Sequence, residues 1–115
     1  MLPIERSREL RADSVTLTLQ IDAGLFWFQG HFPHLPILPG VAQLDWVMHY
    51  GVSLLAPGKQ FVAVDNIKFQ QPVLPDSLLQ LRLDWDAEKS RLSFRYSLLK
   101  DDGEQTASSG KIALC

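Results

Sequence analysis

Two side chains that can exchange protons lie within and just after a proline-rich segment. His31 lies inside the segment and Asp45 follows it, with Pro33, Pro36 and Pro39 between them. The unperturbed pKa of histidine suits proton transfer at neutral pH. Proline restricts the backbone, and a stiff loop either simply connects two elements or holds a catalytic group in place. His31 is therefore a candidate acid–base residue, and Asp45 is a second ionisable group close to it in the sequence.

Pro39-Gly40 is the expected start of a helix. Proline suits the first turn of a helix, where unpaired N–H groups carry the positive end of the helix dipole. Gly40 has no side chain, so the carbonyl of a ligand can approach its amide closely. An oxygen that gains negative charge during a reaction would be stabilised there.

Three polar residues recur along this expected helix at intervals of four: Asp45, His49 and Ser53. That spacing places them on one stripe. Burying such a stripe costs several kcal/mol unless its members find partners. The stripe therefore either faces solvent or a hydrated subunit contact, or it belongs to a site, and the loop before the helix favours the site.

The elements that would position these residues follow from hydrophobic periodicity. Only one segment, from about Val41 to Leu55, has helical length, and because it is apolar nearly all round we expect it to be buried. Apolar and polar residues alternate elsewhere, which is typical of antiparallel strands with one buried face. The expected strands cover about residues 15–21, 61–69, 79–85, 92–98 and 105–114. The pattern predicts an α+β fold, one central buried helix wrapped by a sheet of about five strands, with residues 1–13 as an irregular lead-in.

Length and composition limit the class of protein. The 115 residues fit a single domain over 1–115, and the net charge of −2 provides no general field for nucleic acid or an anionic membrane. The longest apolar region is interrupted by Gln43, Asp45 and His49, which does not indicate a membrane span. Cys115 is the only cysteine, so no intrachain disulfide can form, and the charged N-terminus does not resemble a signal peptide. We expect a cytoplasmic protein.

The loop and helix start resemble a known signature. The run GHFPHLPILPGV is similar to G-H-F-P-x-x-P-x-x-P-G-V of the hot-dog-fold 3-hydroxyacyl-acyl-carrier-protein dehydratases, and Asp45 lies at the family's distance from the histidine. The downstream run VDNIKFQQPVLPDSLL resembles a second family segment, so the resemblance covers about residues 14–115. The run LPGVAQLDWV looks most similar to the small dehydratases of aryl-polyene and related polyene-lipid pathways.

The resemblance implies a reaction and an assembly. It implies dehydration of a 3-hydroxyacyl thioester on acyl carrier protein, without metal or organic cofactor, by a homodimer or an oligomer of such dimers whose sheets join edge to edge. His31 would remove a proton from C2, Asp45 of the other chain would help to expel the C3 hydroxyl as water, and the Gly40 amide would bind the thioester carbonyl. The remaining substrate-binding positions that it implies are Phe32, Pro39 and Val41.

Departures from the family pattern leave alternatives open. His49 stands where the family commonly has Gln, so it can tune or replace the hydrogen-bond partner of the acid, and Gln70-Gln71 replaces a basic pair often found there. The same fold could be a thioesterase, or a non-catalytic subunit that binds acyl carrier protein. His31, His34, Asp45 and His49 could also ligate zinc, but the proline spacing accounts for the loop better, and we expect no metal.

Overall fold

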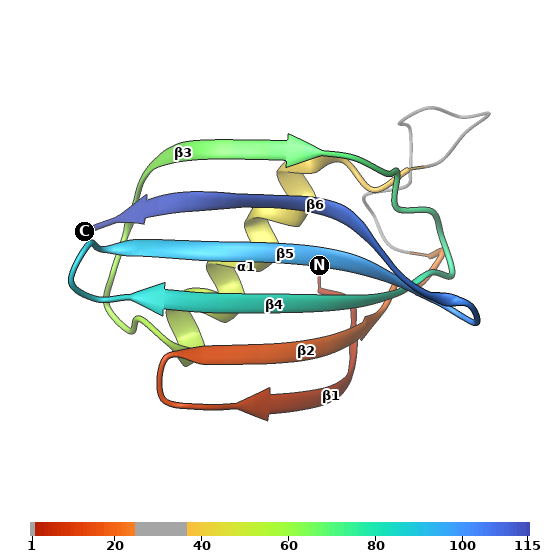
Figure 1. The fold of residues 1–115 in the computed structure, drawn as a ribbon, viewed down its shortest axis with the longest axis horizontal. Helices are drawn as coiled ribbons and strands as arrows, with labels where there is room; N and C mark the ends of the chain where they lie inside the picture. Colours follow the sequence, from red (N-terminus) through yellow and green to blue (C-terminus); the bar gives the residue numbers. More distant parts are fainter. Residues whose placement is uncertain (1, 25–36) are drawn as a thin grey trace.

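The computed structural model describes residues 2–24 and 37–115. Within these ranges the chain forms one helix, α1 (Gly40–Leu54), and a six-stranded antiparallel sheet. The strands are β1 (Ile4–Leu10), β2 (Ser14–Gln20), β3 (Phe61–Phe69), β4 (Leu78–Asp86), β5 (Arg91–Lys100) and β6 (Gly103–Leu114). Their order across the sheet is β1-β2-β4-β5-β6-β3, and α1 crosses one face of it, behind the sheet in Figure 1. The expected α+β class is confirmed, with six strands rather than about five.

The additional strand is β1, which lies in the segment that we expected to be an irregular lead-in. That expectation is wrong for Ile4–Leu10. All seven residues of β1 are exposed, because the strand lies at the edge of the sheet and pairs only with β2. Charged residues occupy both of its faces, so the sequence lacks the apolar alternation from which strands were predicted.

The alternation of the central strands is confirmed and builds the core. Leu17 of β2 pairs with Leu81 of β4, and Leu83 of β4 pairs with Phe94 of β5, so these side chains share one face of the sheet. All four are buried in the cluster that includes Trp46 of α1. Removing this apolar surface from water is the main driving force for packing the helix on the sheet.

The helix lies close to the sheet along one face only. A Cβ atom added at Gly51 would lie 2.4 Å from Cδ2 of Leu92, so glycine permits this close approach. The buried residues of α1 are Ala42, Gln43, Trp46, Val47, Tyr50 and Gly51. The expected packing of the helix against the sheet is confirmed for this face, and the opposite face of α1, which carries the polar stripe, is exposed in the chain as described. No helix in the described ranges has the length and apolarity needed to cross a bilayer.

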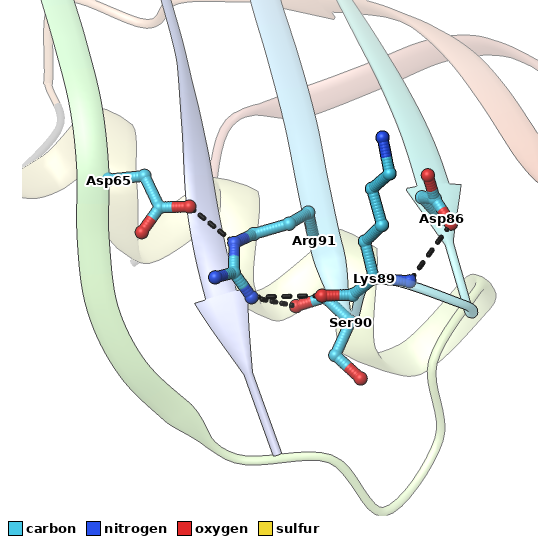
Figure 2. A network of polar contacts seen from close by, with 5 residues as sticks. All are labelled: Asp65, Asp86, Lys89, Ser90 and Arg91. Carbon is cyan, nitrogen blue, oxygen red and sulfur yellow. Dashed lines mark hydrogen bonds and ion pairs between the residues drawn. The ribbon is translucent and has the colours of Figure 1, made fainter.

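The second edge of the sheet is β3, which pairs only with β6. Asp65 of β3 reaches past β6 to form an ion pair with Arg91 of β5 (Figure 2). The Arg91 guanidinium also donates to the carbonyls of Lys89 and Ser90 at 2.9 and 3.3 Å, and the Lys89 amide donates to Asp86 at 3.1 Å. This network connects the edge strand to the turn between β4 and β5.

Candidate active site

The start of α1 carries backbone amides that lie before the hydrogen-bonded turns of the helix. Pro39 is the N-cap residue, with extended backbone angles (φ −67°, ψ 154°), and its carbonyl accepts from the amides of Ala42 and Gln43 at 3.1 and 3.3 Å. The amides of Gly40 and Val41 have no backbone acceptor within the described ranges. The first turn also contains no acidic residue, so the positive end of the helix dipole is not neutralised locally.

A cavity of about 490 Å³ adjoins this helix start. An added Cβ at Gly40 would lie 2.6 Å from Cζ of the Phe69 ring, so any larger residue would displace that ring. Figure 1 shows the start of α1 beside the end of β3 that carries Phe69. The lining residues are Ile37, Leu38, Pro39, Gly40, Gln43, Phe69, Gln70, Gln71 and Pro72. The predicted residues Gly40 and Pro39 therefore adjoin a space large enough for part of a ligand.

The stripe of polar residues lies on the open face of α1. Asp45, His49 and Ser53 are exposed, and with Lys59 they contribute to a hollow of about 370 Å³. Val41, one turn before Asp45, is 64% exposed, which is high for a large apolar side chain. Of the two arrangements that the sequence left open, the described chain therefore has the stripe facing outward. Among the described residues, Asp45 and Gly40 line different hollows.

The remaining predicted site residues, His31 and Phe32, lie outside the described residues, as does His34. Within residues 2–24 and 37–115, no three His, Cys, Asp or Glu side chains gather as metal ligands would.

Gln43 lines the same cavity with a buried side-chain amide, and its sequence pattern had not marked it as a site residue. In the sequence, Gln43 only interrupts an apolar run, yet its side chain is 3% exposed in the structure. Its Oε1 accepts a hydrogen bond from Oγ of Ser108 at 2.6 Å, and its main-chain carbonyl accepts one from the Tyr96 hydroxyl at 2.6 Å. One signal was available: Gln43 precedes Trp46 and Val47 by three and four residues, which places it on the buried face of the helix.

The hydroxyl of Tyr96 remains a donor over a wide pH range. Burial raises the pKa of Tyr96 well above its ordinary value, and interactions with Tyr50 and Asp45 raise it further. Because the phenol stays protonated, its hydrogen bond to Gln43 is retained near neutral pH.

Comparison with known proteins identifies the family. Residues 7–111 match the ApeI-like family, which is described as ApeI dehydratase. The chain belongs to the ApeI-like dehydratase family. Its arrangement of one helix against an antiparallel sheet is the hot-dog fold that the sequence resemblance implied, and that prediction is confirmed.

Two solved structures are similar to this ApeI-like chain over nearly their whole lengths. An uncharacterized protein from Erwinia carotovora subsp. atroseptica is 55% identical, with a TM-score of 0.95, and the match covers 100% of this chain and 97% of that one. The dehydratase heterocomplex ApeI:P from Xenorhabdus doucetiae contains a chain that is 50% identical, with a TM-score of 0.94 and coverage of 100% and 99%.

The curated relatives are longer proteins. The 3-hydroxyacyl-acyl-carrier-protein dehydratase FabZ of Proteus mirabilis is 36% identical over 87 residues, which are 68% of this chain and 58% of that protein. The ApeI-like chain spans between half and three-fifths of the length of such relatives. The similarity establishes the dehydratase family and leaves the specific activity to be argued from the site.

Proposed function

We propose that this protein dehydrates a 3-hydroxyacyl thioester, carried by acyl carrier protein, to the trans-2-enoyl thioester. The observation that carries the proposal is the helix start, where the Gly40 amide, which has no backbone acceptor among the described residues, adjoins a cavity of about 490 Å³. The family and the relatives named as 3-hydroxyacyl-acyl-carrier-protein dehydratases support the same reaction class. An amide at a positive helix end suits the thioester oxygen, which gains negative charge when C2 loses its proton.

The proposed reaction divides among three groups. His31 takes the C2 proton, and the electron pair of that C–H bond moves onto the thioester oxygen as an enolate. That pair then returns to form the C2–C3 double bond as the C3–O bond breaks, and Asp45 gives its proton to the departing hydroxyl, which leaves as water. The thioester oxygen accepts a hydrogen bond from Gly40 while it carries charge. Transfer of the proton from His31 to Asp45 restores the starting state.

A second subunit is part of the proposal, because Asp45 lies on the open face of α1 rather than in the cavity beside Gly40. We propose that two copies join through their β3 edges and that Asp45 of each chain serves the cavity of the other. The exposed apolar side chains of β3 support this contact: Phe61, Val62 and Phe69 are each more than half exposed. The Xenorhabdus protein is described as a heterocomplex, so a subunit of different sequence is the alternative partner.

Mixing two inactive variants tests both the roles and the sharing of the site. His31→Ala and Asp45→Ala should each abolish dehydration while leaving the chain folded. When the variants are unfolded together and refolded, random pairing makes half of the dimers mixed, each with one intact site, so about a quarter of wild-type turnover should return. Near-normal dehydration by either variant alone would refute the assigned roles. Absence of recovery in the mixture would refute the shared site.

The alternative activities separate in one assay. Intact-protein mass spectrometry follows 3-hydroxyacyl carrier proteins, with alkyl and with aryl acyl groups, during incubation with the protein. Loss of the mass of one water identifies dehydration, whereas loss of the whole acyl group and release of free thiol identify a thioesterase. Binding of the carrier protein without product at every chain length identifies a non-catalytic subunit.

A further inference from the structure

Gln43 is a carboxamide on the helix face that packs against the apolar core. Burying an amide without hydrogen bonds is costly, so its partners indicate why it is tolerated there. Its Oε1 accepts from Ser108 at 2.6 Å, and its Nε2 donates to the carbonyl of Leu38 at 3.4 Å. The side chain therefore joins the sheet to the segment that precedes α1.

The sheet side of this link is held firmly. Ser108 of β6 and Tyr96 of β5 are cross-strand partners, and both contact Gln43, one through its side chain and the other through its main-chain carbonyl. Tyr96 and Ser108 are each 0% exposed. Two hydrogen bonds consequently hold Gln43 to a pair of central strands, and the one from Ser108 places its carboxamide.

The loop side of the link leads directly to Gly40. The Leu38 amide donates to the carbonyl of Val73 at 2.8 Å, while its carbonyl accepts from Gln43. Only Pro39 separates Leu38 from Gly40, and the proline ring fixes φ at that residue. The Pro39 carbonyl is in turn held by the amides of Ala42 and Gln43. The Gly40 N–H belongs to the same peptide group as the Pro39 carbonyl, so the contacts that hold Leu38 and Pro39 also constrain its direction.

We propose that Gln43 is a positioning residue, which orients the Gly40 amide toward the thioester oxygen by holding the Leu38 carbonyl. The inference rests on the proposed dehydration and adds a residue to it. Gln43 acts through Leu38 and Pro39, not on the reacting atoms. A misdirected amide still admits substrate but stabilises the charged oxygen less, so the loss falls on kcat rather than KM.

Three variants test this role. Gln43→Met keeps the length of the side chain and removes its hydrogen bonds, so kcat should fall about tenfold to a hundredfold with KM little changed. Ser108→Ala removes the hydrogen bond to Oε1 of Gln43 and should also lower kcat. The double variant should be no worse than Gln43→Met alone, because both changes break one chain of contacts.

Tyr96→Phe is the matched control. It removes a buried hydrogen bond of the same length to the same residue but leaves the carboxamide on Leu38. Its melting temperature should fall as in Gln43→Met, while its kcat stays within about twofold of wild type. Equal kcat losses in Gln43→Met and Tyr96→Phe, or a loss confined to KM, would overturn the positioning role.

An NMR measurement separates this inference from the proposed function. If the wild-type protein dehydrates no 3-hydroxyacyl thioester, the proposed function fails. The orientation of Gly40 can then still be tested by the NMR chemical shift of its amide and by hydrogen exchange at Leu38. A changed Gly40 shift and faster exchange at Leu38 in Gln43→Met, but not in Tyr96→Phe, support the positioning of Gly40. Identical spectra at these residues in the two variants overturn it.

Discussion

The two edges of the sheet differ in the side chains that they present. Four of the seven residues of β1 are charged, and Ile4 and Leu10 are its only large apolar side chains. In β3 only Asp65 and Lys68 of nine residues are charged. Both strands contain bulges, so charge rather than irregular pairing distinguishes them. An unprotected edge is a template for another strand, and charges prevent such pairing.

Two of the four charged side chains of β1, Glu5 and Arg8, lie on the core side of the sheet. Glu5 and Arg8 pair with Leu19 and Leu17, whose side chains are buried, and form an ion pair with each other at 2.8 Å. They lie close enough to affect Tyr50: burial raises the pKa of its phenol, Glu5 raises it further and Arg8 lowers it. Charged side chains that point inward prevent another strand from pairing at an edge, which supports the proposal that β3 binds the partner while β1 is protected.

The largest expected effect comes from adding a charge to β3. Val62→Lys would place an ammonium group in the proposed contact between subunits, at a cost of about 3 kcal/mol or about a hundredfold weaker association. Dehydration should fall with the loss of dimer, because the proposed site needs both chains. Light scattering after size-exclusion chromatography measures the first effect and the turnover assay measures the second.

Ile4→Lys provides the control on the opposite edge. Ile4 is 45% exposed and Val62 is 53% exposed, and both are β-branched residues of edge strands. The Ile4→Lys protein should keep the size and turnover of wild type. Equal loss of dimer in the two variants would contradict the assignment of partner binding to β3.

A smaller effect should follow from removing the charges of β1. The double change Glu5→Val and Arg8→Val leaves the net charge unaltered but makes the inner face of this edge apolar. We expect concentration-dependent association beyond the dimer, observed by sedimentation velocity, because the edge then accepts another strand. Arg82→Val with Asp84→Val is the matched control, since it removes an exposed ion pair from a central strand. Association of the control to the same extent would show that added apolar surface, not the edge, is responsible.

The smallest effect concerns the ion pair that connects β3 to the sheet. Arg91→Met should lower the free energy of unfolding by less than about 1 kcal/mol, since the side chains of Arg91 and Asp65 are 40% and 36% exposed. Hydrogen exchange should accelerate in β3 and remain unchanged in β2. Arg82→Met breaks an exposed pair within one strand and should leave β3 unaffected. Unchanged exchange in β3 of the Arg91→Met protein would show that the ion pair does not brace this edge.

Elements with strong local signals were predicted well from the sequence. The central strands alternate because one face packs on the helix, and the helix begins at Gly40 beside Pro39, within one residue of the predicted start. β1 was missed because both faces of this edge strand are exposed, so apolar and polar residues do not alternate along it. The sequence left open whether the polar stripe of α1 faces outward, because the type of a neighbouring residue such as Val41 suggests burial although it is 64% exposed.

The candidate site divides in the same way. Pro39-Gly40 as a helix start follows from local chemistry and is confirmed, whereas the catalytic roles of His31 and Asp45 stay predictions. Gln43 could not be assigned because its partner Ser108 lies 65 residues further along the chain. Contacts over such separations depend on how α1 packs on β5 and β6, which no local pattern specifies.

The pairing of β3 with β6 has a consequence for the order of events during synthesis. β3 neighbours only β6 in the sheet, although β4 and β5 lie between them in sequence. On the ribosome, residues 61–69 therefore emerge before the strand that will hold them, and cannot join the sheet until residues 103–114 have followed. The edge that we assign to a partner is consequently among the last parts to form, so nascent chains with unfinished sheets do not yet offer it to one another.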